Sequence, residues 1–375
     1  MKTVLTIFGT RPEAIKLAPV IRELTKHQTI KSRICVTAQH REMLDQVLRL
    51  FHITPDFDLD LMRPDQDLPS LTAHVITETA RVLARERPDI VLVQGDTTTV
   101  MAAAMASFYL DIPVGHVEAG LRSGNPRSPF PEEMNRRATT AVSTLHFAPT
   151  ETARNSLLRE GVQDNHIFVT GNPVIDALQF IADQPTPLKA KHLLARGGLN
   201  GSGDDPKLIL VTAHRRENFG EGLEQIFHGL RNLIERNKDI RIIYPVHLNP
   251  NVQDLAYRIL GETERIFLTE PLEYGVLGHL MKASYIILTD SGGIQEEAPS
   301  LGKPVLVMRT ETERPEGIQA GTAKLIGPEA GSIIRETELL LQDKNAYQNM
   351  ARAVNPYGDG HAAERIVKIL LSYDV

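Results

Sequence analysis

The sequence predicts an α/β protein made of two Rossmann-like, doubly wound parallel-sheet domains. The first observation behind this prediction is that short β-branched runs alternate with helix-length amphipathic segments, as they do in βα units. The second is that these runs form two similar sets. The third is size, because 375 residues suit two domains of roughly 100–200 residues each, and 42% apolar with 23% charged residues is a globular composition.

Each predicted strand ends near a Gly, Thr, His or Asp and leads into a helical pattern, such as the one over residues 223–236. In the first half, strands are predicted at residues 4–8, 33–37, 90–94, 114–117, 146–149 and 167–170. In the second half, they are predicted at residues 208–212, 240–246, 266–269, 285–289, 305–308 and 324–326. We therefore expect six strands in each parallel sheet.

The domain boundary is expected after residues 171–173, so that the domains span residues 1–172 and 173–357. Residues 184–206 contain three prolines and four glycines, and this composition indicates a loop-rich connector. A helix over residues 174–182 is the candidate hinge.

The last part of the chain, residues 358–375, is expected to return to the first domain. Residues 355–360 form a turn-rich string, which allows the chain to reverse its direction. Residues 362–371 then have the pattern of an amphipathic helix, and we expect this helix to pack on the first domain.

Composition excludes several classes of function. A formal net charge of −6 and an isoelectric point near 6.1 give no basic surface for nucleic acid. The single cysteine, Cys35, lies in an apolar run, so neither an intramolecular disulfide nor a cysteine metal cluster is expected, and a buried, inert thiol is predicted.

The sequence also lacks the spacings of common cofactor sites. The thirteen histidines show neither His-x-x-x-His nor His-Glu-x-x-His, so no metal site is predicted. No Gly-x-Gly-x-x-Gly follows the first strand, so no nicotinamide cofactor is expected. The start of the chain leads directly into strand-like sequence and no apolar stretch reaches about 18 residues, which favours a cytoplasmic protein without a membrane partner.

Ligands of open parallel sheets bind at the carboxyl ends of the strands, where strand order reverses. After the first predicted strand, Thr10 can cap a helix and Pro12 suits its first turn. Arg11 beside this helix N-terminus indicates an anion site. Lys16 is placed either toward the same ligand or over the surface, and a simple helix cap remains the alternative for the whole segment.

A second helix start lies in the other half, at residues 289–298. Ser291 is the predicted cap, and Gly292 and Gly293 allow backbone amides to approach a phosphate. Glu297 follows one to two turns later, where its carboxylate can accept hydrogen bonds from ribose hydroxyls. The alternative is an ordinary Ser-Gly-Gly turn.

Cationic and acidic groups divide between the two halves. His214 and Arg215 follow one strand of the second half, and Arg309 to Arg314 follow another, so a diphosphate could receive several donors there unless these are solvated loop charges. In the first half, the strand ends carry the carboxylates Asp96 and Glu118, and Glu132 follows in the next loop. The division fits phosphates and a nucleoside on the second domain and a reacting group at the first.

Six ordered motifs together resemble the non-hydrolysing UDP-N-acetylglucosamine 2-epimerases of bacteria, over essentially the whole chain. The motifs are residues 9–13, 39–46, 95–99, 116–122, 290–293 and 355–360. The resemblance implies the glycosyltransferase-B fold, in which two Rossmann-like domains face a central cleft. It also implies a cytoplasmic homodimer that uses neither metal nor nicotinamide and supplies a precursor of cell-surface polysaccharide.

The resemblance also implies roles for individual residues. Asp96, Glu118 and Glu132 would be the acid/base carboxylates, with Arg11, Lys16 and His214 near the sugar or the diphosphate. Ser291, Gly292 and Gly293 would hold phosphate, Glu297 the ribose and Arg314 the diphosphate.

The resemblance further implies that a second UDP-N-acetylglucosamine regulates the enzyme. Gln39, Glu42, Arg215 and His247 match that regulatory region. One position departs from the pattern, because Leu277 stands where relatives tend to place a Phe against the uracil, which puts aromatic stacking there in doubt.

The expected reaction is epimerisation at C2 by elimination of UDP to a 2-acetamidoglucal, followed by re-addition. Three alternatives remain open: an epimerase that hydrolyses its product, a UDP-sugar glycosyltransferase, and a catalytically silent sensor. Substrates with an extra acetamido group at C3 or a carboxylate at C6 are also open, and the sequence does not assign a carboxylate to each face of the sugar.

Overall fold

The computed structural model describes residues 1–38, 41–61, 66–201 and 205–373. The chain forms two compact units. The first unit contains Met1–Ala177 together with Tyr357–Val375, and the second contains Leu178–Pro356. Each unit is an α/β domain with a parallel sheet, which confirms the predicted fold class.

The first unit is built on a seven-stranded sheet with the order β3-β2-β1-β4-β5-β6-β7. The strands are β1 (Lys2–Phe8), β2 (Ile30–Val36), β3 (Phe57–Asp58), β4 (Ile90–Gln94), β5 (Val114–Val117), β6 (Leu145–Ala148) and β7 (Ile167–Val169). Six of them match predicted strands, and β3 corrects the expected number. This strand has only two residues and follows Pro55, so it leaves no β-branched run to detect.

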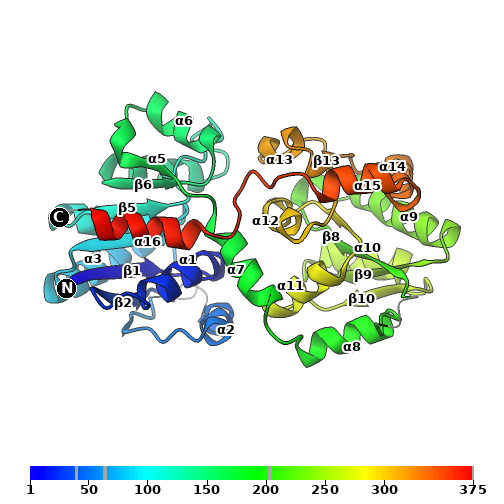
Figure 1. Cartoon of the computed structure of the whole chain (residues 1–375), viewed down its shortest axis with the longest axis horizontal. Helices are drawn as coiled ribbons and strands as arrows, with labels where there is room; N and C mark the ends of the chain where they lie inside the picture. Colours follow the sequence, from blue (N-terminus) through cyan, green and yellow to red (C-terminus); the bar gives the residue numbers. More distant parts are fainter. Residues whose placement is uncertain (39–40, 62–65, 202–204, 374–375) are drawn as a thin grey trace. The chain divides into compact units, whose positions relative to one another are not determined.

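Helices cover this sheet on both faces. They are α1 (Arg11–Leu24), α2 (Arg41–Phe51), α3 (Leu68–Glu86), α4 (Thr98–Tyr109), α5 (Glu132–Val142), α6 (Glu151–Arg159), α7 (Pro173–Ala182) and α16 (Ala362–Ser372), with a 3₁₀ turn η1 (Asp164–His166). The unit boundary falls inside α7. The C-terminal helix α16 lies beside α1, as Figure 1 shows, and Lys2 Nζ donates to the carbonyl of Leu370 at 2.9 Å.

The second unit is built on a six-stranded sheet with the order β10-β9-β8-β11-β12-β13. The strands are β8 (Lys207–Thr212), β9 (Ile240–Pro245), β10 (Ile266–Thr269), β11 (Ile286–Thr289), β12 (Val305–Val307) and β13 (Ala323–Leu325). All six lie where the β-branched runs predict them.

Ten helical segments accompany this sheet in the described residues. They are α8 (Leu188–Arg196), η2 (Arg216–Asn218), α9 (Glu221–Arg236), α10 (Pro250–Leu260), α11 (Tyr274–Ala283), α12 (Gly292–Glu297), η3 (Ala298–Leu301), α13 (Pro315–Gln319), α14 (Ala330–Gln342) and α15 (Lys344–Ala351). The predicted helix over residues 223–236 corresponds to α9.

Strand order reverses once in each sheet, between β1 and β4 and between β8 and β11. Both reversals arise because the chain adds strands first on one side of its starting strand and later on the other. The segments directly after these four strands therefore begin at the place where open α/β sheets bind ligands. These segments contain most of the side chains that the sequence singled out.

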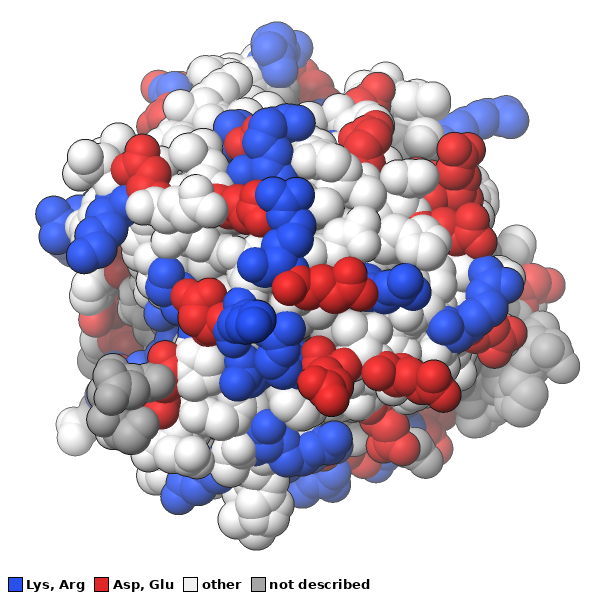
Figure 2. Space-filling model, turned by 90° about the vertical axis from the view of Figure 1, so that its right-hand side faces the viewer, with Lys and Arg blue, Asp and Glu red and all other residues white. Residues whose placement is uncertain are grey.

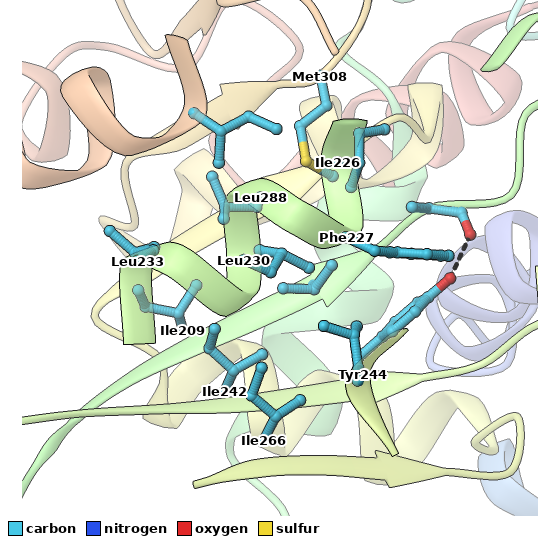
Figure 3. Close-up of a cluster of buried hydrophobic side chains, with 14 of the residues drawn as sticks. Ile209, Ile226, Phe227, Leu230, Leu233, Ile242, Tyr244, Ile266, Leu288 and Met308 are labelled. Carbon is cyan, nitrogen blue, oxygen red and sulfur yellow. Dashed lines mark hydrogen bonds between the residues drawn. The ribbon is translucent and has the colours of Figure 1, made fainter. Parts of the chain in front are cut away.

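The core of the second unit fixes the start of one of these segments. Figure 3 shows the apolar face of α9, including Ile226, Phe227 and Leu230, packed on β8 and β9. Burying a side chain of this size stabilises the fold by about 1.5–3 kcal/mol. Tyr244 is fully buried in this cluster, and its hydroxyl donates to the carbonyl of Ala213 at 2.7 Å, so the core holds the chain in place just after β8.

The surface carries no large field of one sign on the face that Figure 2 presents. Basic and acidic side chains of the described residues are interspersed there (Figure 2). Within the described ranges, no helix is both long and apolar enough to cross a membrane. Cys35 is buried, as predicted, and burial raises the pKa of its thiol to about 12, so the thiol stays protonated.

Candidate active site

The polar side chains of the first unit gather at the carboxyl ends of three neighbouring strands. Gly9 begins the turn after β1, Asp96 follows β4 after one glycine, and Glu118 follows β5 directly. Because neighbouring parallel strands end at the same edge, these three segments share one edge of the sheet. The reversal of strand order lies between the first two of them.

Glu118 has an unusual backbone conformation. Its φ is +65°, in the left-handed region that non-glycine residues seldom adopt, and such a conformation costs about 1–3 kcal/mol. Gly120, two residues on, has a φ of +91°, and a Cβ there would lie 2.3 Å from the carbonyl oxygen of Ala153. The tight turn and the strained glutamate are held by packing, and strained backbone of this kind clusters at functional sites.

Three donors from separate parts of the unit hold the Glu118 carboxylate, which is 8% exposed. Lys16 Nζ in α1 lies 2.5 Å from Oε1, and Asn172 Nδ2 donates to the same oxygen at 2.9 Å. Gln94 Nε2, at the end of β4, donates to Oε2 at 2.5 Å. Charge-assisted hydrogen bonds of this kind fix an ionised carboxylate in one orientation.

Glu13 ties the loop after β1 to the loop after β4. Its Oε2 accepts hydrogen bonds from the backbone amides of Gly9 at 2.6 Å and Thr10 at 3.0 Å, and the Thr97 hydroxyl donates to Oε1. Glu13 is buried, and burial raises its pKa to about 7 against the opposing effect of these hydrogen bonds. The α1 start is therefore anchored on the residue that follows Asp96.

Helix α5 is anchored on the same loop. Arg136 Nη2 lies 2.5 Å from Asp96 Oδ2, and Asn135 Nδ2 donates to the Asp96 carbonyl at 2.9 Å. Glu132 is the first residue of α5, and its Oε2 is buried without a hydrogen bond to the described residues. The structure thus brings Asp96 and the helix that starts with Glu132 to one place.

His116 holds the loop after β4 through a hydrogen bond to its backbone. Its ring is fully buried, and Nε2 lies 2.7 Å from the carbonyl oxygen of Gly95. Burial lowers the pKa of His116 to about 3, so the ring is neutral and can donate its N–H to that carbonyl. The histidine therefore fixes the backbone next to Asp96 without adding a charge.

In the second unit, the buried carboxylate of Asp290 organises the ends of β8 and β11. Its Oδ2 accepts hydrogen bonds from the backbone amides of His214 and Arg215, both at 2.8 Å. The hydroxyls of Thr212 and Thr289 meet at 2.6 Å just before this point. The loop after β8 is therefore locked against the strand that leads to the helix start at α12.

His214 carries a half-buried imidazole next to this carboxylate. The ring stacks on His247 with centroids 5.2 Å apart and an angle of 17° between the ring planes. Burial lowers the pKa of His214, and the neighbouring His247 and Arg215 act in the same direction while Asp290 opposes them. The imidazole is therefore expected to be neutral at neutral pH, with one ring nitrogen able to donate a hydrogen bond and the other able to accept one.

Two guanidinium groups converge on the start of α12. A Cβ on Gly292 would lie 3.6 Å from Arg215 Nη2 and 4.0 Å from Arg314 Nη2, so the glycine leaves open space between the helix start and both cations. Ser291 is the N-cap residue, as predicted, but its hydroxyl does not cap the helix. A glycine, backbone amides at a helix start and two arginines together suit a phosphate group.

Glu297 lies one and a half turns further along. Tyr274, at the start of α11, donates its hydroxyl to Glu297 Oε1 at 2.7 Å. The other oxygen, Oε2, lies 3.8 Å from the position of a Cβ on Gly293. The carboxylate therefore lies against the same helix start and can accept hydrogen bonds from a sugar hydroxyl.

Arg309 has a different role from the one that its position in the sequence suggests. It is 4% exposed, and its guanidinium pairs with the carboxylates of Glu217 and Glu313. Burial alone would lower the pKa of Arg309, but these two carboxylates outweigh it and raise the pKa further. Arg309 therefore joins the loop that carries Arg215 to the loop that carries Arg314, and its charge is neutralised within the unit.

Comparison with known proteins assigns this arrangement to a family. The family model for UDP-N-acetylglucosamine 2-epimerase matches residues 22–371. The chain belongs to the UDP-N-acetylglucosamine 2-epimerase family. It is 54% identical over 369 residues to the UDP-N-acetylglucosamine 2-epimerase of Escherichia coli K12, which covers 98% of each protein.

Solved structures of this epimerase family agree with the fold. The UDP-GlcNAc 2-epimerase of Neisseria meningitidis, solved with UDP-GlcNAc bound, matches with a TM-score of 0.87 and 50% identity over 99% of this chain and 100% of that one. The enzyme of Methanocaldococcus jannaschii, in complex with UDP-GlcNAc and UDP, matches with a TM-score of 0.79 and 35% identity over 99% and 100%.

Arg11, Gln39, Glu42 and Leu277 complete the residues assigned by resemblance to the epimerases. Arg11 is the first residue of α1, and its guanidinium has no hydrogen bond or ion pair in the part of the chain that the structure describes. Gln39 and the side chain of Glu42 lie outside the described residues. Leu277 packs against the apolar core of the second unit, where an aromatic ring is expected in relatives.

Four buried contributors to the site escaped sequence reasoning: Glu13, Gln94, Asn172 and Tyr274. Glu13 has a detectable signal, since it stands three residues after Thr10 in the spacing of a capping box. The other three act through partners 24, 54 and 23 residues away, and no local spacing reports such contacts.

Among the residues that the structure describes, no group of three or more His, Cys, Asp or Glu side chains is arranged to hold a metal ion. The carboxylates at the two sites are instead engaged by lysine, amide and hydroxyl donors.

Proposed function

We propose that this chain converts UDP-N-acetylglucosamine reversibly to UDP-N-acetylmannosamine, without net hydrolysis. The observation that carries the proposal is the buried carboxylate of Glu118, which follows β5 in a strained backbone conformation and accepts hydrogen bonds from Lys16, Gln94 and Asn172. It supports a proton-transfer role in a chain that belongs to the UDP-N-acetylglucosamine 2-epimerase family over most of its length.

The chemistry requires elimination, because C2 of the sugar is not adjacent to a carbonyl and its proton is weakly acidic. A base removes H2, the C2–H electron pair forms the C1=C2 double bond, and the C1–O pair leaves with UDP. The product is a 2-acetamidoglucal. UDP then adds back to C1 while a proton reaches C2 from the opposite face, which inverts C2 and restores every atom.

Acid and base groups are needed on both faces of the sugar, and a positioned group of this kind contributes typically 10²–10⁴-fold to the rate. We assign these roles to Glu118, Asp96 and Glu132. Lys16 lies 2.5 Å from Glu118, and its positive charge favours the ionised carboxylate that a base requires. Arg11 is proposed to contact the sugar or the diphosphate.

The second unit is proposed to bind UDP. Arg215, Arg314, Ser291 and the backbone at Gly292 and Gly293 form the diphosphate cradle, and they stabilise the charge of the leaving UDP. Glu297 accepts hydrogen bonds from the ribose. The neutral ring of His214 is proposed to share a proton with the leaving phosphate oxygen.

Three further proposals follow from the family resemblance. The enzyme acts in the cytoplasm as a homodimer, without metal or nicotinamide. A second UDP-N-acetylglucosamine activates it through Gln39, Glu42, Arg215 and His247. The stacking of His247 on His214 supports a link between such a regulatory molecule and the candidate active site.

Product analysis separates this proposal from its rivals. UDP-N-acetylglucosamine is incubated with the protein and followed by phosphorus and proton NMR. The proposal predicts a mixture with UDP-N-acetylmannosamine and no accumulation of UDP. Free N-acetylmannosamine with an equal amount of UDP would establish the hydrolysing reaction, UDP release that depends on an acceptor would establish a glycosyltransferase, and binding without conversion would leave a sensor.

A further inference from the structure

The two chain connections between the units leave the first unit from one place. One connection runs through Gly171 and Asn172 into α7, and the other arrives at Tyr357 and Gly358. The two segments are in close contact, since a Cβ on Gly171 would lie 3.2 Å from the Cα of Gly358 and 3.4 Å from the carbonyl oxygen of Tyr357. Both glycines have positive φ, at +85° and +139°, and they allow the backbones to approach this closely.

Asn172 lies at the centre of this contact, and all of its polar groups are used. Its backbone N–H donates to the Tyr357 carbonyl at 2.7 Å, and its own carbonyl accepts from the amide of Ile175 at 3.1 Å. Its side-chain Oδ1 accepts from the amide of Val174 at 3.2 Å, in the manner of a helix cap. The residue is 1% exposed, so each of these groups would be costly to leave unpaired.

The cap determines which way the side-chain amide faces. Because Oδ1 accepts from Val174, the Nδ2 group is directed to Glu118, where it donates to Oε1 at 2.9 Å. The same oxygen faces Lys16 Nζ at 2.5 Å. Asn172 thus links the contact between the two chain connections to the Glu118 carboxylate after β5.

We propose that Asn172 is a positioning residue for Glu118. It holds one oxygen of the carboxylate in the orientation needed for proton transfer at C2. Because Asn172 is itself held by Tyr357, that orientation depends on the contact between the two chain connections. This inference rests on the proposed function, because it assumes that Glu118 exchanges a proton with the sugar. It adds a residue and a structural link that the candidate active site alone does not contain.

The test is the isosteric change Asn172→Asp. Aspartate caps a helix as well as asparagine does, so the bond to Val174 is retained, but the donor facing Glu118 is replaced by a carboxylate oxygen. We expect kcat and the rate of deuterium exchange at C2 to fall at least about 30-fold, while KM and the dissociation constant for UDP change less than about threefold. A purely structural role would leave kcat near that of the parent.

Asp176 supplies a matched control from the next turn of the same helix. It is buried, and its Oδ1 and Oδ2 accept from the amides of Ala363 at 2.8 Å and Ala362 at 3.3 Å, so it also joins α7 to the returning chain. Within the described part of the chain it makes no hydrogen bond to Glu118, and it has no part in the proposed chemistry. Asp176→Asn should change kcat by less than about threefold.

A second variant keeps the test decisive if Asn172→Asp folds poorly. Asn172→Ser retains a capping hydroxyl and removes the donor, and it should show the same loss of kcat with unchanged UDP binding. Parent-like turnover in either folded variant would overturn the inference, as would an equal loss in Asp176→Asn. Failure of the parent itself to exchange hydrogen at C2 would instead overturn the proposed function.

Discussion

Replacing Glu118 by glutamine tests the proton-transfer role most closely. The change preserves the size of the side chain and one acceptor oxygen, but it removes the negative charge that faces Lys16 at 2.5 Å. It also places an amide N–H₂ where one oxygen accepted a donor from Asn172 or Gln94. The variant therefore loses the ability to take up a proton while keeping most of the local shape.

The effect on stability can be bounded from these contacts. A hydrogen bond to a charged group contributes about 1.5–3 kcal/mol and a neutral one about 0.5–1.5, and Lys16 retains some solvent contact with 19% of its side chain exposed. Relief of ion-pair desolvation opposes part of this loss. We expect Glu118→Gln to lower the free energy of unfolding by about 1–3 kcal/mol, which corresponds to about 2–12 °C in Tm for a domain of this size.

The effect on rate should be much larger than the effect on stability. Loss of a general base is expected to lower kcat and C2 exchange at least about 100-fold while UDP still binds. Glu160→Gln is the control, because Glu160 pairs with Arg122 at 2.7 and 2.8 Å and has no role in the proposed chemistry. Turnover of Glu118→Gln close to that of this control would refute the catalytic role, and joint loss of UDP binding would indicate a structural one.

Four further outcomes are expected. Chelators should leave turnover unchanged, and added nicotinamide cofactor should not raise it. Turnover that a chelator abolishes and a divalent ion restores would contradict this prediction. The rate should depend cooperatively on UDP-N-acetylglucosamine, and a hyperbolic curve that His247→Ala leaves unchanged would count against regulation. Tyr274→Phe should weaken UDP binding about threefold to tenfold by titration calorimetry, because Glu297 loses the donor that orients it; parent affinity would show that the tyrosine is dispensable. Because burial raises the pKa of Glu13 from 4.5 to about 7, the folded state holds a proton that the unfolded state releases between these values, so this group lowers stability as pH rises from 4.5 to 7. Denaturant unfolding of Glu13→Gln should lack that contribution, and an unchanged pH dependence would contradict it.

The fold was predictable because parallel strands buried on both faces leave continuous apolar runs. The runs at β4 and β8 are examples, with Ile90–Gln94 predicted to the residue and Lys207–Thr212 within one residue. The exceptions have physical reasons. β2 begins three residues before the predicted start because the exposed Lys31 and the polar Ser32 interrupt the apolar pattern, and β3 is too short to have a pattern.

The candidate site was predictable only where chemistry follows a strand end. Asp96, Glu118, His214 and Ser291 are detectable because the rule for parallel sheets points to their positions. Their contact partners come from distant parts of the sequence that the fold brings together. Asn172 and Gln94, which both donate to Glu118, are examples. The sequence does not reveal that the charge of Arg309 is neutralised, for the same reason, because Glu217, one of the two carboxylates that pair with it, lies 92 residues away.

Deuterium incorporation at C2 tests the central claim most directly. UDP-N-acetylglucosamine is incubated with the protein in deuterated water, and the C2 proton signal is followed by NMR together with the appearance of UDP-N-acetylmannosamine. Proton removal and return from solvent predict that the signal disappears and that both UDP-sugars become deuterated at C2 as they approach equilibrium. Epimerisation with full retention of the C2 proton, or no conversion at all, would contradict the mechanism built on Glu118.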